Sequence, residues 1–195
     1  REYNDIYGKL GAVYASAIYN NKLYLGTNQG LFYKTYNSTE DFSFVKGTNG
    51  QVWFLKVIDD NLFCGHNSGT FIINQTNISL IANKMGTWNI KPIPGKTNLL
   101  IQGNYDGLHI LEKNNNNWQY RNKLKGFDVS SRYFEFESER SLFVSHEYKG
   151  VIKLKLDDNY TEVLEFLTDV SVPKGLKSSL VTFNNNILYT SKEGV

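Results

Sequence analysis

The feature that most constrains this chain is a short sequence unit that recurs along its whole length. Its clearest copy is Leu23-Tyr24-Leu25-Gly26-Thr27-Asn28-Gln29-Gly30-Leu31-Phe32. In each copy an apolar triplet leads to a small residue, then to a short polar turn, and then to a glycine that opens a second apolar run. This order predicts a strand, a turn and a second strand. The turn glycines are Gly30, Gly69, Gly107, Gly150 and Gly194, at intervals of 39, 38, 43 and 44 residues.

A period of about 40 residues is compatible with several repeat folds, and the content of each period selects among them. Leucine-rich repeats are shorter, and HEAT or armadillo units need helices, whereas no segment here carries a helical stripe of apolar residues. Each period instead contains four short β-type runs, the content of one propeller blade. We therefore predict an all-β fold, a β-propeller of four-stranded antiparallel blades with four blades and a partial fifth. The predicted blades span residues 9–46, 51–83, 87–121, 131–168 and 178–195.

Turn and breaker residues set the limits of the predicted strands. Asn20-Asn21 reads as a two-residue hairpin turn, because Asn tolerates positive φ. Pro92 and Pro94 should make the innermost strand of the third blade short or bulged. Asn114 to Asn117 reads as a loop between the last two strands of that blade. Residues 1–8 are either a tail or the outer strand of a preceding blade, and we expect further blades to complete the ring, since an arc leaves pairing edges open.

The second strand of each repeat is almost continuously apolar, as expected for a strand covered on both faces. Cys64, the single cysteine, lies in one of these strands and reads as a small buried hydrophobe, with a reactive thiol as the alternative. Truncating a buried Trp or Phe in such a column should cost about 3 to 5 kcal/mol. The residues that we predict to be buried between blades are Trp53, Leu62, Phe63, Leu100, Phe143 and Leu188.

Composition and motifs narrow the function classes. The net charge of +2, from 21 basic and 19 acidic residues, is nearly balanced, and no segment concentrates Lys or Arg, so nucleic-acid binding has little support. No apolar run approaches the roughly 20 residues that span a bilayer, and no signal peptide opens the sequence. The protein is therefore cytosolic, or its targeting segment lies outside this sequence. No nucleophile, metal-protease, phosphate-loop or dinucleotide-binding motif is present. We predict no enzyme activity, no cofactor and no metal.

His66 and His146 occupy the position of Thr27, directly after the small residue that ends a second strand. The favoured interpretation is that both side chains hydrogen-bond the following turn. Ligand contact is the main alternative, and a metal site has less support because blades diverge outward while metal ligands must converge. Asp59-Asp60 and Asp157-Asp158 read as turn residues that bond local backbone rather than as catalytic carboxylates.

Two repeats resemble a known family. Tyr19 to Leu31 and, less closely, Asp60 to Gly69 are similar to the repeat of the two-component regulator propeller, whose consensus is D-x-x-G-x-L-W-I-G-T-x-x-G-L. The resemblance implies the extracytoplasmic sensor region of hybrid histidine kinases and related transcriptional regulators of Bacteroidetes-type bacteria. It also implies a periplasmic or extracytoplasmic location. In that family a small β-sandwich domain and a membrane helix usually follow the propeller.

The propeller topology predicts where a ligand would bind. In a four-stranded blade the turn between strands two and three opens on the same side as the link into the next blade, and we call this side the turn face. Aromatic rings beside amides and charges suit a glycan or a peptide. We rank a ligand-binding sensor first, a protein-interaction scaffold second, and a polysaccharide lyase or glycosidase third. The expected partners are that ligand and the remaining blades and downstream domains of a parent chain, with no nucleic acid and no membrane in this segment. The predicted contact residues are Trp88, Tyr105, Arg132, His146 and Tyr148.

Overall fold

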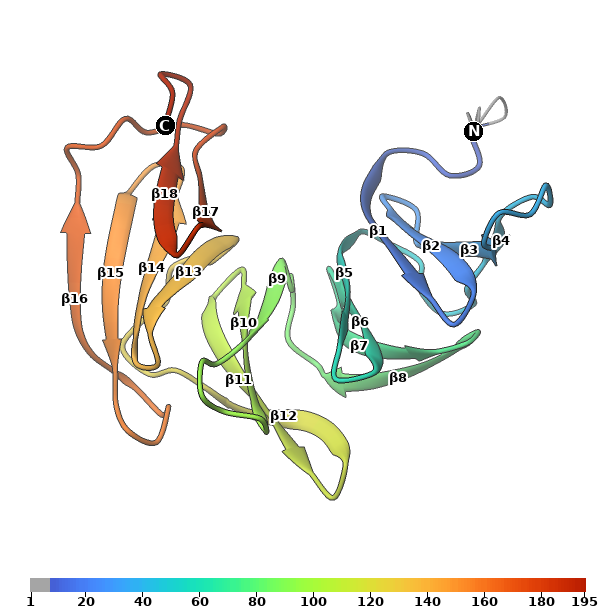
Figure 1. Cartoon of the computed structure of the whole chain (residues 1–195), viewed down its shortest axis with the longest axis horizontal. Helices are drawn as coiled ribbons and strands as arrows, with labels where there is room; N and C mark the ends of the chain where they lie inside the picture. The colour runs from blue at the N-terminus through green and yellow to red at the C-terminus, as the bar shows by residue number, and fades with distance from the viewer. Residues whose placement is uncertain (1–7) are drawn as a thin grey trace. The chain divides into compact units, whose positions relative to one another are not determined.

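The computed structural model describes residues 8–195 (Figure 1), so the prediction for the N-terminal segment falls almost entirely outside the described residues. Every regular element in the described residues is a β-strand. The chain divides into two compact units, one ending at Thr87 and the other beginning at Trp88. Each four-stranded sheet is called a blade below.

The first unit contains two antiparallel blades whose strand order follows the chain. The first blade consists of β1 (Val13–Tyr19), β2 (Lys22–Thr27), β3 (Leu31–Thr35) and β4 (Ser43–Phe44). The second consists of β5 (Val52–Ile58), β6 (Asn61–His66), β7 (Gly69–Asn74) and β8 (Asn77–Ala82).

The second unit contains two further blades of the same topology and a two-stranded sheet. The third blade consists of β9 (Asn89–Pro92), β10 (Leu99–Asn104), β11 (Gly107–Asn114) and β12 (Asn117–Lys123). The fourth consists of β13 (Tyr133–Ser138), β14 (Ser141–His146), β15 (Gly150–Leu156) and β16 (Val163–Asp169). The last sheet pairs β17 (Ser179–Phe183) with β18 (Asn186–Thr190). Four complete sheets and a partial fifth confirm the predicted number and type of elements.

The turn and breaker residues limit the strands much as the sequence predicts, with one exception. Asn20 and Asn21 have φ values of 46° and 58°, which confirms the two-residue turn between β1 and β2. The proline-containing strand β9 has only four residues, as predicted. The loop prediction for residues 114–117 was too long. Asn115 and Asn116 alone form the turn, with φ of 49° and 63°, and the flanking asparagines belong to β11 and β12.

The small residue that ends the apolar triplet makes room for the chain that passes over it. A Cβ on Gly26 would lie 2.5 Å from Val52 Cγ1, and one on Gly65 would lie 2.5 Å from the carbonyl oxygen of Thr87. A Cβ on Gly103 would overlap the carbonyl oxygen of Ser131. These glycines are not in the left-handed region, so close approach rather than backbone freedom requires them. In the first three blades the repeated glycine therefore lets the following link pack closely against the sheet.

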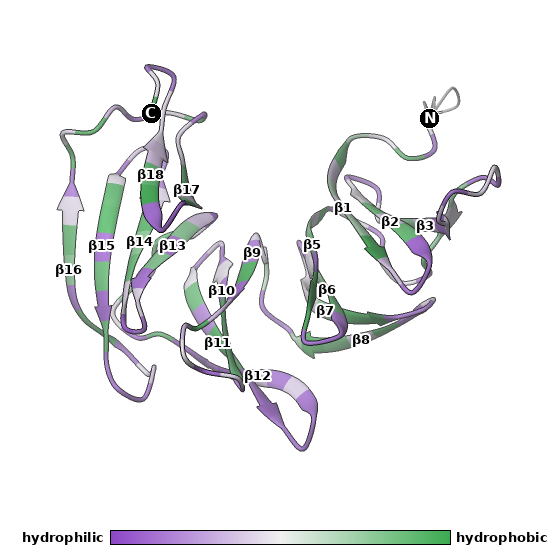
Figure 2. Ribbon diagram, in the orientation of Figure 1, coloured by the Kyte–Doolittle hydropathy of each residue, from purple (hydrophilic) through white to green (hydrophobic). Residues whose placement is uncertain are grey.

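Apolar side chains on facing sheets form a separate core in each unit, and Figure 2 shows that the apolar colouring concentrates on the strands. In the first unit the fully buried residues Tyr24, Leu31 and Leu62 belong to a cluster shared by both blades. In the second unit Phe134 and Leu142 belong to the equivalent cluster. All residues of β10 and nearly all of β6 are buried, which confirms that the second strands of these blades are covered on both faces.

Three of the six residues predicted to be buried are buried: Leu62, Phe63 and Leu100. The prediction was wrong for Trp53, which is only partly buried. The pairing of β5 with β6 shifts register between Val52 and Phe54, so a β-bulge leaves Trp53 unpaired. Val52 takes the buried place, and the Trp53 ring packs on Tyr14 with centroids 4.8 Å apart. Truncating Trp53 should therefore cost less than the loss of a fully buried ring.

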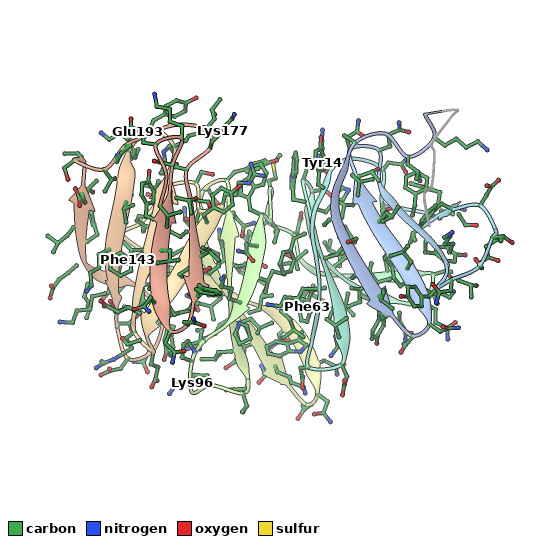
Figure 3. The ribbon with its side chains drawn as sticks, turned by 45° about the horizontal axis from the view of Figure 1, so that its top comes forward. Tyr14, Phe63, Lys96, Phe143, Lys177 and Glu193 are labelled. Carbon is green, nitrogen blue, oxygen red and sulfur yellow. The ribbon has the colours of Figure 1, made fainter. Side chains whose placement is uncertain are left out.

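The prediction was also wrong for Phe143 and Leu188, which are partly buried. Phe143 lies on β14 (Figure 3), on the face against which β17 packs. Because the last sheet has two strands rather than four, it covers only part of this face. A cavity of about 480 Å³ remains beside Phe143, with Leu180, Ile187 and Tyr189 on its opposite wall.

Cys64 is buried within the apolar core, as predicted. Its side chain has 0% exposure, and burial raises the pKa of the thiol to about 12. A thiol-reactive dye at about pH 8 should therefore leave the native protein unlabelled, because the thiolate is the nucleophile and both its population and its access are low. The measurement is the mass of the protein after labelling, natively and in urea. Equal labelling rates in the two conditions would contradict this account.

Candidate functional site

In the first, second and fourth blades, the last residue of the second strand hydrogen-bonds the turn that follows it on the turn face. Thr27 Oγ1 accepts hydrogen bonds from the backbone N–H groups of Gln29 and Gly30, at 3.0 and 3.2 Å. His66 Nδ1 accepts from the N–H of Ser68 at 3.0 Å. His146 Nδ1 accepts from the N–H of Tyr148 at 3.2 Å. The prediction that both histidines hydrogen-bond their turns is confirmed.

The two histidines differ in what their second ring nitrogen contacts. Because Nδ1 accepts an N–H in each, the proton of the neutral ring is on Nε2. His66 is 1% exposed, and its Nε2 donates to the carbonyl oxygen of Thr48 at 3.3 Å. His146 is half-buried, and its Nε2 has no hydrogen-bond partner within residues 8–195. Desolvation and the nearby Lys149 lower the pKa of His146, so its ring is neutral near pH 7 and offers a free donor.

A cleft of about 200 Å³ opens on the turn face of the second unit, and we call it the turn-face cleft. Its walls come from the links that lead into β9, β13 and β17, from the first residue of β13, and from the end of β14 with the turn that follows it. This convergence of links and turn on one side follows from the meander order of the strands. The lining residues are Trp88, Ser130, Arg132, Tyr133, Ser145, His146, Glu147, Leu176 and Ser178.

Three of the five predicted contact residues, Trp88, Arg132 and His146, line the turn-face cleft. Tyr105 does not line it, but its ring packs on Trp88 with centroids 5.2 Å apart and so supports that wall. Tyr148 is 69% exposed and lies beside the ring of His146, at 6.1 Å, where it lines a different cavity of about 560 Å³. Whether these side chains contact a ligand remains a prediction.

Sequence reasoning missed Ser145, which stands at the repeat position that is glycine in the first three blades. At Gly65 and Gly103 a Cβ would lie 2.5 Å or less from a backbone oxygen of the link into the next blade, whereas the fourth blade accommodates the Ser145 side chain in the wall of the turn-face cleft. Ser145 is 3% exposed, and its hydroxyl forms no hydrogen bond with any described residue. The change from Gly to Ser in the repeat was the signal that could have revealed it.

Arg132 is held by aromatic rings rather than by a carboxylate. Its guanidinium carbon lies 4.9 Å from the ring centroid of Trp88 and 5.0 Å from that of Tyr133. Within the described part of the chain neither Arg132 nor Glu147 forms an ion pair, although both line the turn-face cleft. Among the described residues, the cleft therefore offers a guanidinium and a carboxylate that form no ion pair. Such groups can fix the orientation of a polar ligand.

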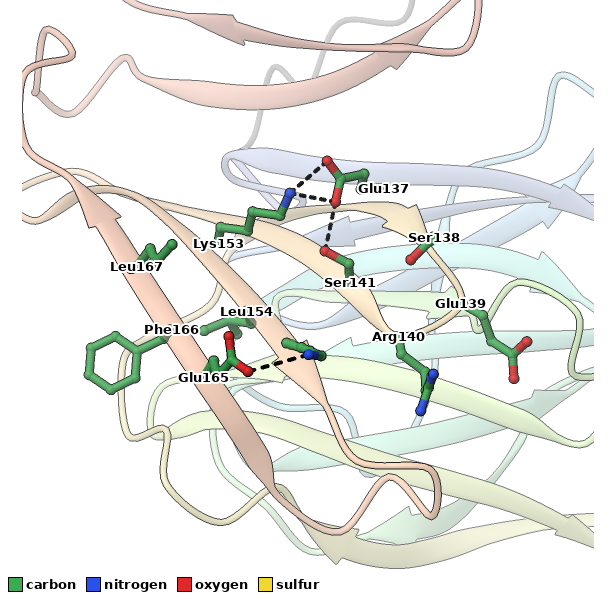
Figure 4. A pocket seen from close by; sticks show the side chains of 11 residues that line it. Glu137, Ser138, Glu139, Arg140, Ser141, Lys153, Leu154, Glu165, Phe166 and Leu167 are labelled. Atoms are coloured by element: carbon green, nitrogen blue, oxygen red, sulfur yellow. Dashed lines mark hydrogen bonds and ion pairs between the residues drawn. The ribbon is translucent and has the colours of Figure 1, made fainter.

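A larger groove of about 460 Å³ lies on the fourth blade (Figure 4), but its charged groups mostly satisfy one another. Lys153 Nζ lies 2.7 Å from Glu137 Oε2, and Ser141 Oγ donates to the same carboxylate at 2.8 Å. Lys155 Nζ lies 3.3 Å from Glu165 Oε1. A ligand there would have to displace existing ion pairs, so we favour the turn-face cleft despite its smaller volume.

Other sequence candidates have local roles. Asp157 accepts hydrogen bonds from the backbone N–H groups of Thr161 and Glu162 at 2.6 and 2.8 Å, as predicted for a turn aspartate.

No group of three His, Cys, Asp or Glu side chains within residues 8–195 is arranged to hold a metal ion. The same residues contain no helix of the length and apolar character needed to cross a bilayer.

Solved structures share the fold of this chain at low sequence identity. The WD40 β-propeller domain of Doa1 is 14% identical with a TM-score of 0.58, and the match covers 92% of this chain and 64% of that one. The computationally designed protein Ika8 is 14% identical with a TM-score of 0.61, covering 93% and 56%. The extracellular domain described as that of a hybrid two-component system from B. thetaiotaomicron is 16% identical with a TM-score of 0.61, covering 91% and 24%.

These matches show that the chain has the fold of a partial β-propeller. The chain spans less than two thirds of the length of each of these three structures. No family model and no curated protein sequence matches it. A two-component extracellular domain stands among the structural neighbours, as does a WD40 domain, so the predicted architecture is confirmed at the level of fold.

Proposed function

We propose that this chain is a non-enzymatic ligand-binding propeller segment that takes a glycan or a peptide in the turn-face cleft. The observation that carries the proposal is the convergence of Arg132, Ser145 and His146 on one cleft beside the ring of Trp88, each with a donor that no residue between 8 and 195 uses. Rigid blades hold these groups, and the links and turns that bear them can vary without disturbing the sheets. Binding rather than catalysis is proposed, because Glu147 is the only carboxylate among the described residues that line the cleft, and glycoside hydrolysis usually needs a pair.

The biological setting that we propose is the input region of a bacterial two-component or transcriptional regulatory protein, in the periplasm or elsewhere outside the cytoplasm. Its support is the repeat resemblance together with the two-component extracellular domain among the structural neighbours. Ligand occupancy would then be the signal, and a downstream output would read the change.

Calorimetric titration with a panel of neutral and acidic oligosaccharides and short peptides tests this proposal. Trp88→Ala should abolish or strongly weaken binding of any probe that binds the wild type. Trp53→Ala is the matched control, because it removes a second partly buried Trp that packs on a Tyr. Tyr105→Ala, which removes only the support of the Trp88 wall, should weaken binding about 3- to 10-fold, since an aromatic pair contributes about 0.5 to 1.5 kcal/mol.

Circular dichroism establishes that each variant is folded. A wild-type protein that binds none of the probes would refute the proposal. Undiminished binding by folded Trp88→Ala and Tyr105→Ala variants would refute the placement of the site.

A protein-interaction scaffold is the second candidate, and exposed apolar residues on the edge strand β16 favour it. Leu164, Phe166 and Leu167 are 52%, 58% and 72% exposed. Exposed apolar side chains beside an unpaired strand edge are the features that a protein partner covers by strand addition. Concentration-dependent sedimentation of the wild type and of a Phe166→Ser/Leu167→Ser variant would test self-association through this edge. A monomeric wild type at all concentrations would remove the self-association form of this candidate.

A further inference from the structure

We propose that Arg132, His146 and Ser145 form a carboxylate-binding subsite within the turn-face cleft. This inference rests on the proposed function and specifies the chemical class of its ligand. Within residues 8–195 the fourth blade leaves two donors open, His146 Nε2 and Ser145 Oγ. At the equivalent positions the second blade has His66, whose Nε2 contacts a carbonyl oxygen, and Gly65, which has no side chain.

The first donor of the subsite is the Nε2–H of His146, which differs from that of His66. In the second blade the link into β5 brings the carbonyl oxygen of Thr48 within 3.3 Å of His66 Nε2, which closes that donor. In the fourth blade the same ring orientation is fixed by the Tyr148 N–H, but no described residue accepts from His146 Nε2. An N–H donor that the fold orients and leaves open is suited to an acceptor atom of a ligand.

Ser145 gives the second donor. A buried hydroxyl without a partner is costly, because its hydrogen bonds to water are lost on folding. Ser145 is 97% removed from solvent in the cleft wall, and its Oγ has no partner among the described residues. The corresponding glycines of the first three blades have no such group. An acceptor from a ligand would satisfy this hydroxyl.

Arg132 supplies the charge. Its guanidinium is exposed, rests between the rings of Trp88 and Tyr133, and has no ion-pair partner within residues 8–195. The rings orient the planar group without using its N–H donors, so these stay available for a planar anion. A carboxylate has two acceptor oxygens and can bond to a guanidinium and to neutral donors at the same time. Two neutral donors and one guanidinium therefore match a carboxylate better than a neutral sugar hydroxyl.

Glu147 restricts the rest of the ligand. Its carboxylate lines the same cleft and would repel a second anionic group, while it would accept from a hydroxyl or an ammonium. The ligand is thus a small carboxylate that carries a donor nearby. Sugar acids and the carboxyl-terminal residue of a peptide share this chemistry, and a cleft of about 200 Å³ holds one such residue rather than a long chain.

The test is a calorimetric or chemical-shift titration with D-glucuronate, D-glucose, L-alanyl-L-alanine and L-alanyl-L-alanine amide at millimolar concentrations. We expect D-glucuronate to bind at least about 10-fold more tightly than D-glucose, and the dipeptide acid at least about 10-fold more tightly than its amide. Hydrogen bonds to charged groups are stronger than those between neutral groups. Arg132→Ala should weaken acid binding about 10-fold, and Ser145→Ala about 3-fold. Arg140→Ala is the control, because Arg140 lies between β13 and β14, outside the cleft, and pairs with Asp158.

The results distinguish failure of the subsite from failure of the proposed function. Preference for glucuronate over the dipeptide identifies a sugar acid, and the reverse identifies a peptide terminus; both support the subsite. Equal binding of acids and neutral matches, or equal losses in Arg132→Ala and Arg140→Ala, would overturn the subsite and leave the proposed function standing. No binding of any of the four probes would overturn the subsite, and the panel of oligosaccharides and peptides then decides the proposed function.

Discussion

Replacing Gly103 with alanine is expected to lower the free energy of unfolding by about 3 kcal/mol, at the upper end of the usual cost of overpacking. The added Cβ would overlap the carbonyl oxygen of Ser131 and would also meet Phe134 at 2.9 Å. The oxygen belongs to backbone, which cannot rotate away as a side chain can. The link into β13 would have to lift from the third blade, with loss of the hydrogen bond from the Ser131 N–H to Asn104, 3.0 Å long. Urea denaturation followed by tryptophan fluorescence measures the change.

The matched control for Gly103→Ala is Ser145→Ala at the equivalent position of the fourth blade. It adds no atom, and it removes a buried hydroxyl that has no partner among the described residues. Its unfolding free energy should stay within about 0.5 kcal/mol of the wild type or rise. If Gly103→Ala is as stable as Ser145→Ala, the repeated glycine does not serve close packing of the links.

Replacing Phe134 with alanine should cost about 3 to 5 kcal/mol, because the ring is fully buried in the core of the second unit and its loss leaves a cavity. The ring packs among residues of the third and fourth blades in that core, including Leu142 and Ile101. Denaturation midpoints of the purified variant measure the effect.

Phe166→Ala is the control for this second prediction, since that ring is 58% exposed on β16. Its midpoint should remain close to that of the wild type. Similar losses of stability in the two variants would show that the core does not lie between the sheets where Phe134 is placed.

Strand count, meander order and the hairpin turns could be predicted from the sequence, because each depends on local patterns. An apolar triplet, a small residue and a turn glycine are short-range signals, and Asn20-Asn21 carries its own turn preference. The burial of Trp53 could not be predicted in this way. A β-bulge changes which of two neighbouring residues faces the core. The pattern of apolar residues does not show that one residue is left unpaired.

The location of the candidate site could be predicted from the sequence, but the full set of residues that line it could not. Topology alone put Trp88, Arg132 and His146 on one face, and the structure brings these three to one cleft. Tyr105 and Tyr148 do not line this cleft: the Tyr105 ring packs on Trp88, and Tyr148 lies beside His146 and lines a different cavity. The role of Ser145 could not be predicted, because its burial and the lack of a hydrogen-bond partner among the described residues depend on tertiary packing that no repeat pattern encodes.

The most direct test of the turn-face cleft uses the indole N–H signals of the three tryptophans in an ¹⁵N-labelled sample. Only Trp88 lines the cleft, whereas Trp53 lies in β5 and Trp118 in β12. Titration with the carbohydrate or peptide probe that binds best should move the Trp88 signal in a saturable manner and leave the Trp53 and Trp118 signals in place. A saturable shift of Trp53 or Trp118 with Trp88 unmoved would contradict the account, because the ligand would then bind somewhere other than the turn-face cleft.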